Sequence, residues 1–414
     1  MIRSVLFIAV LTAALPAAAQ VATAPAASRK ADSFSDTFRL GTVNIDMRAR
    51  YERVEESRFA EDAEALTLRT RFGFTTAAFN GFSAMAEVAD VRELKDDFNS
   101  TANGNTTVPV VLDPEGSEFN QAWLRYSPYK RFSATVGRQR IQLDNQRFFG
   151  SASFRQHEQT FDAAQFLINP NDAWAVRYAY LDKVNRVPGK GHPVRIAREQ
   201  KLDAHVLNVS YKAAFGTITG YGYFVDNQDL PLQSAETLGL RFNGSRKITG
   251  DDKLNYTIEW ATQDRYANGS SAIDNDYSLI ELAYVNPNYS VRLGHETLGG
   301  NGRAGFQTPF ATLFAFNGWG DRFLTTPVNG LRDVYVTGSA RLAGGDFILT
   351  YHDFRADRTS AGYGNEFDVR YSRSFTPQIS ASVQYAHFRS DSVQIRDADK
   401  LWLTLEWKYQ VSRK

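Results

Sequence analysis

The chain has 414 residues, and its 47 Lys and Arg residues balance 46 Asp and Glu residues to a formal net charge of +1. This balance excludes a general nucleic-acid binder, whose surface should be strongly basic. Because the sequence contains no cysteine, disulfides and thiolate metal sites are excluded as well, and stability must come from the fold itself.

The N-terminus has the features of a secretory signal. It reads MIRSVLFIAVLTAALPAAAQ, with a positive flank at Arg3, an apolar run over about residues 5–15 and small residues at 17–19. The apolar run is shorter than the roughly 20 residues that a membrane-anchoring helix needs. We therefore interpret residues 1–19 as a signal peptide that is removed after Sec-type export.

The remainder is expected to form a short leader and one domain. Residues 20–37 are rich in Ala and Ser and are predicted to be a flexible leader. No linker and no shift in composition follow, so residues 38–414 are predicted to form a single domain.

Apolar and polar residues then alternate in segments of about ten residues, the pattern of transmembrane β-strands. In KLWLTLEWKY, Leu403, Leu405 and Trp407 share one face and Thr404 lies on the other, with Trp402 as an aromatic exception on the polar face. The predicted strands cover residues 40–54, 65–79, 82–90, 118–127, 131–138, 159–168, 173–182, 202–211, 216–225, 236–246, 253–262, 277–286, 289–296, 331–342, 346–353, 364–374, 378–388 and 400–410.

Alternation alone would also suit a soluble β-sandwich. The connections distinguish the two folds, because they alternate strictly between short turns such as Asn80-Gly81 and long loops. A sandwich has no reason to keep this parity, whereas outer-membrane barrels have short turns at one rim and long loops at the other. We predict an all-β, transmembrane antiparallel β-barrel of about 18 strands. The long loops include residues 91–117, 139–158, 183–201, 263–276 and 297–330.

Placing the apolar face against outer-membrane lipid puts many charged residues in the lumen. The predicted interior arginines are Arg48, Arg50, Arg69, Arg71, Arg177, Arg241, Arg292 and Arg370. The predicted interior carboxylates are Asp46, Glu52, Glu87, Glu259, Glu296, Glu366 and Asp368. One interpretation is a set of cross-strand ion pairs that keep the lumen polar and the barrel rigid. The other is a basic patch formed by the arginines of the first two strands.

The stretch GRQRIQLDNQRFFG, residues 137–150, is expected to fold back into the lumen, because an exposed loop would not need its several apolar residues. Its arginines would then point into the remaining opening, where a guanidinium group offers bidentate bonds to carboxylates. In the alternative interpretation the loop is a structural strut tied down by ion pairs. Asp144 could hold one of these arginines in position. The candidate residues of this region are Arg138, Arg140, Asp144, Arg147 and Arg155.

The run VGRQRIQLDNQRFFGSASFRQHEQTFDAAQ, residues 136–165, resembles the signature region of the alginate-export family of outer-membrane proteins. The matching elements are Gly137-Arg138-Gln139, Asp144 with Arg147 and Gly150, Arg155-Gln156, and Gln159 with Phe161-Asp162-Ala163. The first and last strands are similar to the family as well. The resemblance implies an eighteen-stranded barrel that conducts an anionic polysaccharide through an electropositive constriction. One departure is the ending Val-Ser-Arg-Lys, so the barrel-assembly machinery would have to read Trp407 and Tyr409.

Three functions follow as hypotheses. The first is passive export of an alginate-like anionic polysaccharide through an arginine-lined lumen, with periplasmic export components as partners. The second is an anion-selective porin for small charged or amphiphilic solutes, which needs no such components. The third is a secreted carbohydrate-active enzyme on a soluble β-fold.

The enzyme hypothesis lacks the residues it needs. The six histidines are scattered without ligand spacing, and no GxSxG, HExxH or phosphate-binding loop occurs in the sequence. No catalytic residue, metal or cofactor is therefore predicted, and nucleic acid is not expected as a partner. The long segment 297–330 contains FQTPFATLFAFNGWG, whose aromatic content would suit a second constriction, a lid or a contact surface.

Overall fold

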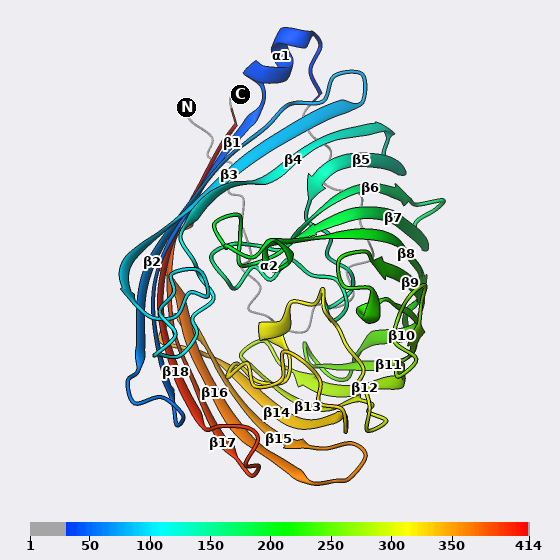
Figure 1. Cartoon of the computed structure of the whole chain (residues 1–414). Coiled ribbons are helices and arrows are strands. Elements are labelled where there is room, and N and C mark those ends of the chain that lie inside the picture. Colours follow the sequence, from blue (N-terminus) through cyan, green and yellow to red (C-terminus); the bar gives the residue numbers. More distant parts are fainter. Residues whose placement is uncertain (1–29, 413–414) are drawn as a thin grey trace.

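The alternating segments fold into eighteen antiparallel strands that close into one barrel (Figure 1). The structure, a computed structural model, describes residues 30–412. Each strand pairs with the next along the chain, and β1 closes the barrel against β18 from Thr42 opposite Ser412 to Glu56 opposite Ala398. The predicted fold and strand number are confirmed. The strands are β1 Thr42–Glu56, β2 Ala63–Thr75, β3 Phe82–Asp97, β4 Gly116–Tyr129, β5 Phe132–Gln139, β6 Thr160–Ile168, β7 Trp174–Asn185, β8 Glu199–Ala213, β9 Gly216–Asn227, β10 Ala235–Lys247, β11 Lys253–Arg265, β12 Asp274–Val285, β13 Tyr289–Leu298, β14 Leu331–Leu342, β15 Gly345–Arg355, β16 Gly362–Ser374, β17 Ile379–Ser390 and β18 Ala398–Ser412.

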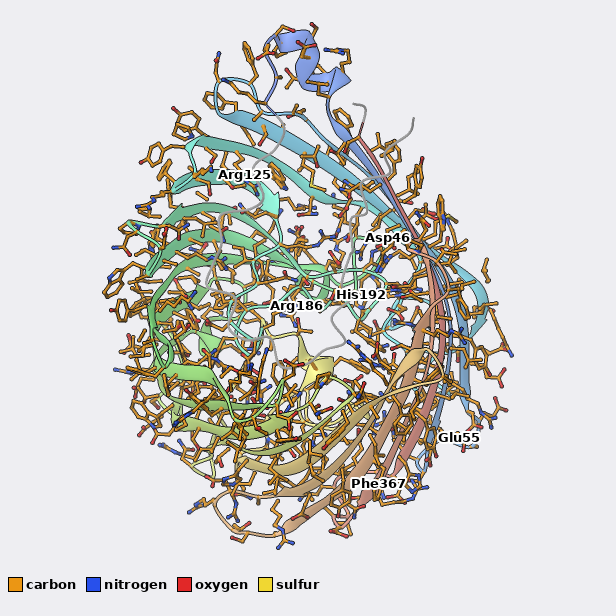
Figure 2. The ribbon with its side chains drawn as sticks, turned by 180° about the vertical axis from the view of Figure 1, so that it is seen from behind. Asp46, Glu55, Arg125, Arg186, His192 and Phe367 are labelled. Atoms are coloured by element: carbon orange, nitrogen blue, oxygen red, sulfur yellow. The ribbon has the colours of Figure 1, made fainter. Side chains whose placement is uncertain are left out.

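The two faces of the wall differ as the alternation predicts. Leu405 on β18 is 52% exposed on the outer face, whereas Trp402 on the same strand is fully buried inside the barrel. Side chains project outward along the whole wall (Figure 2). Closure pairs every strand edge, so the backbone groups of the wall are satisfied without helices. No helix in residues 30–412 is long and apolar enough to cross a membrane.

The connections keep the predicted parity, with short turns at one rim and long loops at the other. The turn between β2 and β3 contains Asn80 and Gly81, with φ of 51° and 84°. These positive values suit the tight turns that match the twist of a hairpin, and Asn and Gly tolerate them best. The residue types at this turn therefore account for its tight geometry.

The N-terminal region differs from the prediction where it is described. Residues 1–29 lie outside the described residues, and with them the predicted signal peptide and the first part of the predicted leader. Residues 34–37 belong to helix α1, Phe34–Arg39, rather than to an irregular leader. Ser33 caps this helix by accepting a hydrogen bond from the Asp36 N–H. Phe38 also stacks on Phe74 of β2, with ring centroids 6.4 Å apart.

Two long loops occupy the lumen, as Figure 1 shows for the chain inside the ring of strands. We call residues 140–159, between β5 and β6, the first lumen loop, and residues 299–330, between β13 and β14, the second lumen loop. They join at Phe149 and Phe310, which form a parallel bridge and stack with centroids 5.5 Å apart. Three short helices lie in connections on this side: α2 Arg195–Arg198, η1 Pro231–Gln233 and η2 Leu313–Ala315.

Candidate functional site

The first lumen loop starts from a close contact between two strands. Gly137 on β5 has φ of 116°, and a Cβ atom at this position would lie 2.4 Å from the carbonyl oxygen of Ala122 on β4. A residue with a side chain could adopt neither the backbone conformation nor the contact. The glycine thus allows β5 to lie against β4 immediately before the chain turns into the lumen.

Arg71 and Arg140 hold the middle of the first lumen loop through carboxylates. Arg71 on β2 donates to Glu158 at 2.6 Å, and Arg140 pairs with both Glu158 and Glu87. Burial alone would raise the pKa of Glu158, but the two guanidinium groups outweigh it and the pKa lies well below its usual range. Glu158 is therefore a charged anchor that joins the loop to β2.

Arg155 fastens the same loop to both the wall and the second lumen loop. Its guanidinium lies 3.2 Å from Glu52 on β1 and donates to Asp321 at 2.8 Å. Burial would raise the pKa of Asp321, yet Lys400 and Arg155 reverse the shift, and the pKa is lowered. These contacts cross-link three parts of the chain that are remote in sequence.

The basic patch predicted on the first two strands lies inside the barrel, but its charges have partners. Arg48 pairs with Glu406 at 2.6 Å and Arg69 pairs with Asp46 at 2.6 Å. Arg50 lies 3.7 Å from Asp113 and over the ring of Phe154. Arg48 and Arg69 therefore form cross-strand ion pairs as in the first interpretation, whereas Arg50 pairs with a loop carboxylate, and none of the three lies in an open basic patch.

Arg147 lies at the contact between the two lumen loops and is 2% exposed. Its guanidinium lies 2.9 Å from Glu296 on β13 and donates to the Asn317 side-chain oxygen at 2.8 Å. Asn317 in turn donates to Glu296 and to Asp333. Arg147 does not point into an opening, because these neighbours enclose it.

Asp144 does not position an arginine through an ion pair within the described residues, which corrects the prediction. Its carboxylate accepts a hydrogen bond from Asn208 on β8 at 2.8 Å. Burial raises the pKa of Asp144, against the opposing charges of Arg241 and Arg177. Arg177 lies inside the lumen as predicted and donates to the Gln142 carbonyl at 2.6 Å.

Arg138 lies on the outer face of the barrel, contrary to its prediction as a pore-lining residue. In the register of β5 and β6 it lies opposite Asp162, on the same face as Val136, which is 56% exposed. Arg138 donates to both Asp162 oxygens, at 2.8 and 3.1 Å. Successive side chains of a strand point to opposite faces, so the outward position of Arg138 follows from the inward position of its neighbour Gln139.

The second lumen loop is held by carboxylates of the opposite wall. Asp368 and Glu366 on β16 accept the backbone N–H groups of Trp319 and Gly320, at 3.3 and 2.7 Å. The aromatic content of this loop suits a constriction, a lid or a contact surface. Its position inside the lumen corresponds to the constriction.

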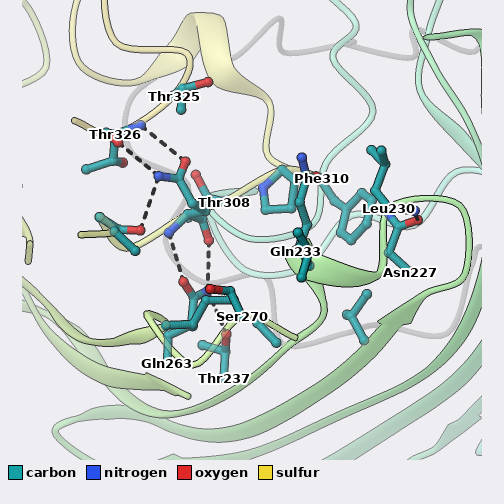
Figure 3. Close-up of a pocket in the computed structure, with 18 of the residues that line it drawn as sticks. Asn227, Leu230, Gln233, Thr237, Gln263, Ser270, Thr308, Phe310, Thr325 and Thr326 are labelled. Carbon is teal, nitrogen blue, oxygen red and sulfur yellow. Dashed lines mark hydrogen bonds between the residues drawn. The ribbon is translucent and has the colours of Figure 1, made fainter. Parts of the chain in front are cut away.

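Cavities of two sizes lie beside the lumen loops. The larger, of about 580 Å³, lies between the second lumen loop, the β9–β10 connection and the inner face of β9 to β11. Figure 3 shows hydrogen bonds along one side of it, where Gln263 donates to Thr237 at 3.2 Å and to the Gln307 carbonyl at 2.9 Å. The smaller, of about 380 Å³, lies between the two lumen loops and the β7–β8 connection.

Arg186 borders both cavities and lies within the ring of strands (Figure 2). It follows β7 directly and donates to the Pro309 carbonyl at 2.9 Å. None of the described residues forms an ion pair with it, and burial lowers its pKa with no neighbouring charge opposing the shift. The charged residues that line the cavities are Arg155, Arg186, Arg303, Arg322 and Lys400 against Glu56 and Asp321.

Sequence reasoning missed several of these residues. Arg186, Asp113 and Asp321 lie in long loops. In a loop, the alternation of apolar and polar residues does not predict whether a side chain points into the lumen. No sequence signal marks Asp113 as a partner of Arg50, because 62 residues separate them and their contact arises from folding. Within residues 30–412 no group of three or more His, Asp or Glu side chains is arranged to hold a metal ion.

Comparisons with known proteins agree with this architecture. A family model described as alginate export matches residues 40–295. No curated protein has a sequence that matches the chain significantly.

Among solved structures, OpdO of Pseudomonas aeruginosa is similar, with a TM-score of 0.71, 13% identity, and coverage of 91% of this chain and 99% of the other. OpdK of the same organism, crystallised with vanillate, has a TM-score of 0.68, 13% identity, and coverage of 90% and 99%. OccAB3 of Acinetobacter baumannii has a TM-score of 0.68, 12% identity, and coverage of 90% and 99%. At such low identity these structures show a common fold.

Proposed function

Because this chain belongs to the alginate-export family and forms an outer-membrane channel, we propose that it conducts small anionic or amphiphilic solutes passively and prefers anions. The observation that supports this is the charge beside the lumen loops. Five cationic side chains line the two cavities against two carboxylates. Arg155, Arg322 and Lys400 are paired with carboxylates, whereas Arg186 and Arg303 form no ion pair with any residue in 30–412.

A permeating ion is attracted mainly by charged side chains that have no partner of opposite charge. Where an arginine already holds a carboxylate at 2.6 to 3 Å, an arriving anion must displace that carboxylate and meets a nearly neutral pair. An unpaired guanidinium in a partly desolvated passage attracts anions more strongly than it would in bulk water. The selectivity should therefore come from the cavity residues more than from the predicted basic patch.

The size of the remaining space favours small solutes. Both lumen loops are fixed to the wall by ion pairs and hydrogen bonds, and they leave cavities of about 580 and 380 Å³ beside them. A hydrated polymer would need these loops to move aside. In this proposal, small solutes pass through this space while the anchors formed by Glu158, Arg155 and Arg147 stay intact.

Passive export of an alginate-like anionic polysaccharide through an arginine-lined lumen is the second candidate. The family match over residues 40–295 supports it. In this case successive arginines of the lumen would exchange their carboxylate partners for those of the polymer, which repeated similar sites make feasible. Periplasmic export components would then be partners, whereas small-solute passage needs none.

Two further partners follow from the barrel itself. The exposed apolar residues of the outer face, such as Leu405, are proposed to contact outer-membrane lipid. The barrel-assembly machinery is proposed to read the aromatic residues Trp407 and Tyr409 of β18, which stack with ring centroids 5.9 Å apart.

Reversal potentials in a planar bilayer test both candidates. With the full-length mature protein in a KCl gradient, anion preference should shift the reversal potential from zero toward the equilibrium potential of chloride. Adding a soluble polyuronate on the periplasmic side then separates the candidates, because the polymer blocks the current when it is a substrate and leaves it unchanged when the passage is too narrow. Cation preference in KCl would contradict both.

A further inference from the structure

We propose that Arg186 and the larger cavity form a binding site for an amphiphilic monocarboxylate. The carboxylate pairs with the Arg186 guanidinium, and the apolar body of the ligand occupies the cavity. This inference rests on the proposed passage of small anions and specifies where such a solute is held.

The Arg186 guanidinium has unused capacity. Of its five N–H donors, one is used within the described residues, in the 2.9 Å bond to Pro309. The residue lines both cavities. A carboxylate is the acceptor that matches a guanidinium edge with two parallel hydrogen bonds.

The position of Arg186 is fixed from both sides. Its backbone N–H donates to the Arg198 carbonyl at 2.7 Å, directly before β8 begins. Its side chain reaches Pro309 in the second lumen loop. The guanidinium is therefore held between the β7–β8 connection and the second lumen loop, and this preorganisation reduces the entropy lost when a ligand binds.

The larger cavity offers an apolar surface next to this charge. Phe149, Tyr223 and Phe310 line it, and Phe149 packs on the other two with centroids 5.0 and 5.5 Å apart. Leu230 and Leu324 are among the further apolar residues that line it. A volume of about 580 Å³ lies within the ~300–1,000 Å³ of typical small-molecule sites.

Several polar residues of the cavity hydrogen-bond to one another. Gln307 donates to the Thr326 carbonyl at 2.9 Å, and its own N–H donates to Gln263 at 2.9 Å (Figure 3). Arg186 and Arg303 are the charged residues among those that line this cavity, and no Asp or Glu is among them. A ligand with one negative charge and an apolar body fits these properties, whereas a neutral ligand leaves the guanidinium unpaired.

Calorimetric titration of the detergent-solubilised full-length mature protein tests the site, with benzoate as the probe. Benzamide serves as the neutral ligand of the same shape, and acetate as the anion without an apolar body. Benzoate should bind at least about tenfold more tightly than either, since one charge-assisted pair and the burial of a ring each contribute about 1.4 kcal/mol or more.

Arg186→Gln should lower benzoate affinity about tenfold or more and leave benzamide affinity unchanged. Arg186→Lys should restore part of the loss, because it returns the charge without the bidentate fork. The matched control is Arg195→Gln, an exposed arginine of α2 that pairs with Asp229 and lines neither cavity. It should bind benzoate as the unmodified protein does.

The outcomes separate this inference from the proposed function. Anion preference in KCl together with benzoate binding that is equal in Arg186→Gln and the unmodified protein would overturn the site while the function stands. Binding of benzamide as tight as that of benzoate would overturn the role of the charge. Cation preference in KCl would remove the proposed function, whatever the titration shows.

Discussion

The first lumen loop and the surroundings of Arg186 use the same side chain in opposite ways. In the loop, Arg140, Arg147 and Arg155 each lie within 3.2 Å of a carboxylate and join the loop to the wall. At the cavities, Arg186 has one carbonyl acceptor and no ion pair with any described residue. The number of arginines in a lumen thus says little about solute binding, because paired arginines stabilise structure and unpaired ones remain for ligands.

The largest effect should come from a paired arginine. Arg147→Met leaves Glu296 buried without its cation, and breaking a buried pair in this way costs about 3–5 kcal/mol. Urea unfolding of the protein in lipid vesicles measures the loss. In the double variant with Glu296→Gln a part of it should return, since no charge is then left unpaired. A single-variant loss below about 1 kcal/mol would contradict the anchoring role.

An unpaired arginine should affect selectivity instead. Even at the dielectric constant of water, a unit charge about 6 Å from a passing ion changes the energy of that ion by ~0.7 kcal/mol. This energy corresponds to about a threefold change in the permeability of that ion. Arg186→Gln should therefore reduce the anion-to-cation permeability ratio about threefold or more, measured from reversal potentials, with little change in unfolding free energy. If the ratio stays the same, the selectivity must arise from other residues.

The pH dependence should be small over the range in which ordinary carboxylates are ionised. The lowered pKa values of Glu158 and Asp321 mean that their stabilising contribution is complete above the usual carboxylate pKa of about 4. It is lost as the pH falls through the lower folded-state values. Current fluctuations caused by release of these two anchors should therefore be absent from about pH 7 to pH 4 and should appear below that in single-channel recordings. Loop fluctuations that begin near pH 6 would show that these anchors do not limit loop motion.

The smallest effect is expected at Arg138. It lies on the outer face, and Lys183 at 3.1 Å from Asp162 would still compensate that carboxylate. Arg138→Gln should therefore leave the reversal potential unchanged. This variant is the matched control for Arg186→Gln, because each removes one arginine close to the same rim. A shift as large as that of Arg186→Gln would place Arg138 at the lumen.

The strands and their faces follow from the sequence alone. Alternation is a local property, because successive side chains of a strand point to opposite sides. Leu405 outside and Trp402 inside were therefore predictable from their positions, and the turn at Asn80 and Gly81 from its residue types. The same parity placed Arg48, Arg50, Arg69, Arg71 and Arg177 inside the barrel. Applied to β5, it would also have placed Arg138 outside.

Tertiary structure alone decided which charges are compensated. Arg155 meets Asp321 across 166 positions of the chain, and Arg147 meets Asn317 across 170. Such contacts depend on how two irregular loops fold into a lumen whose width is set by all eighteen strands, and no local pattern encodes that distance. Whether an arginine serves as an anchor or remains free for a ligand is settled only when these loops are in place.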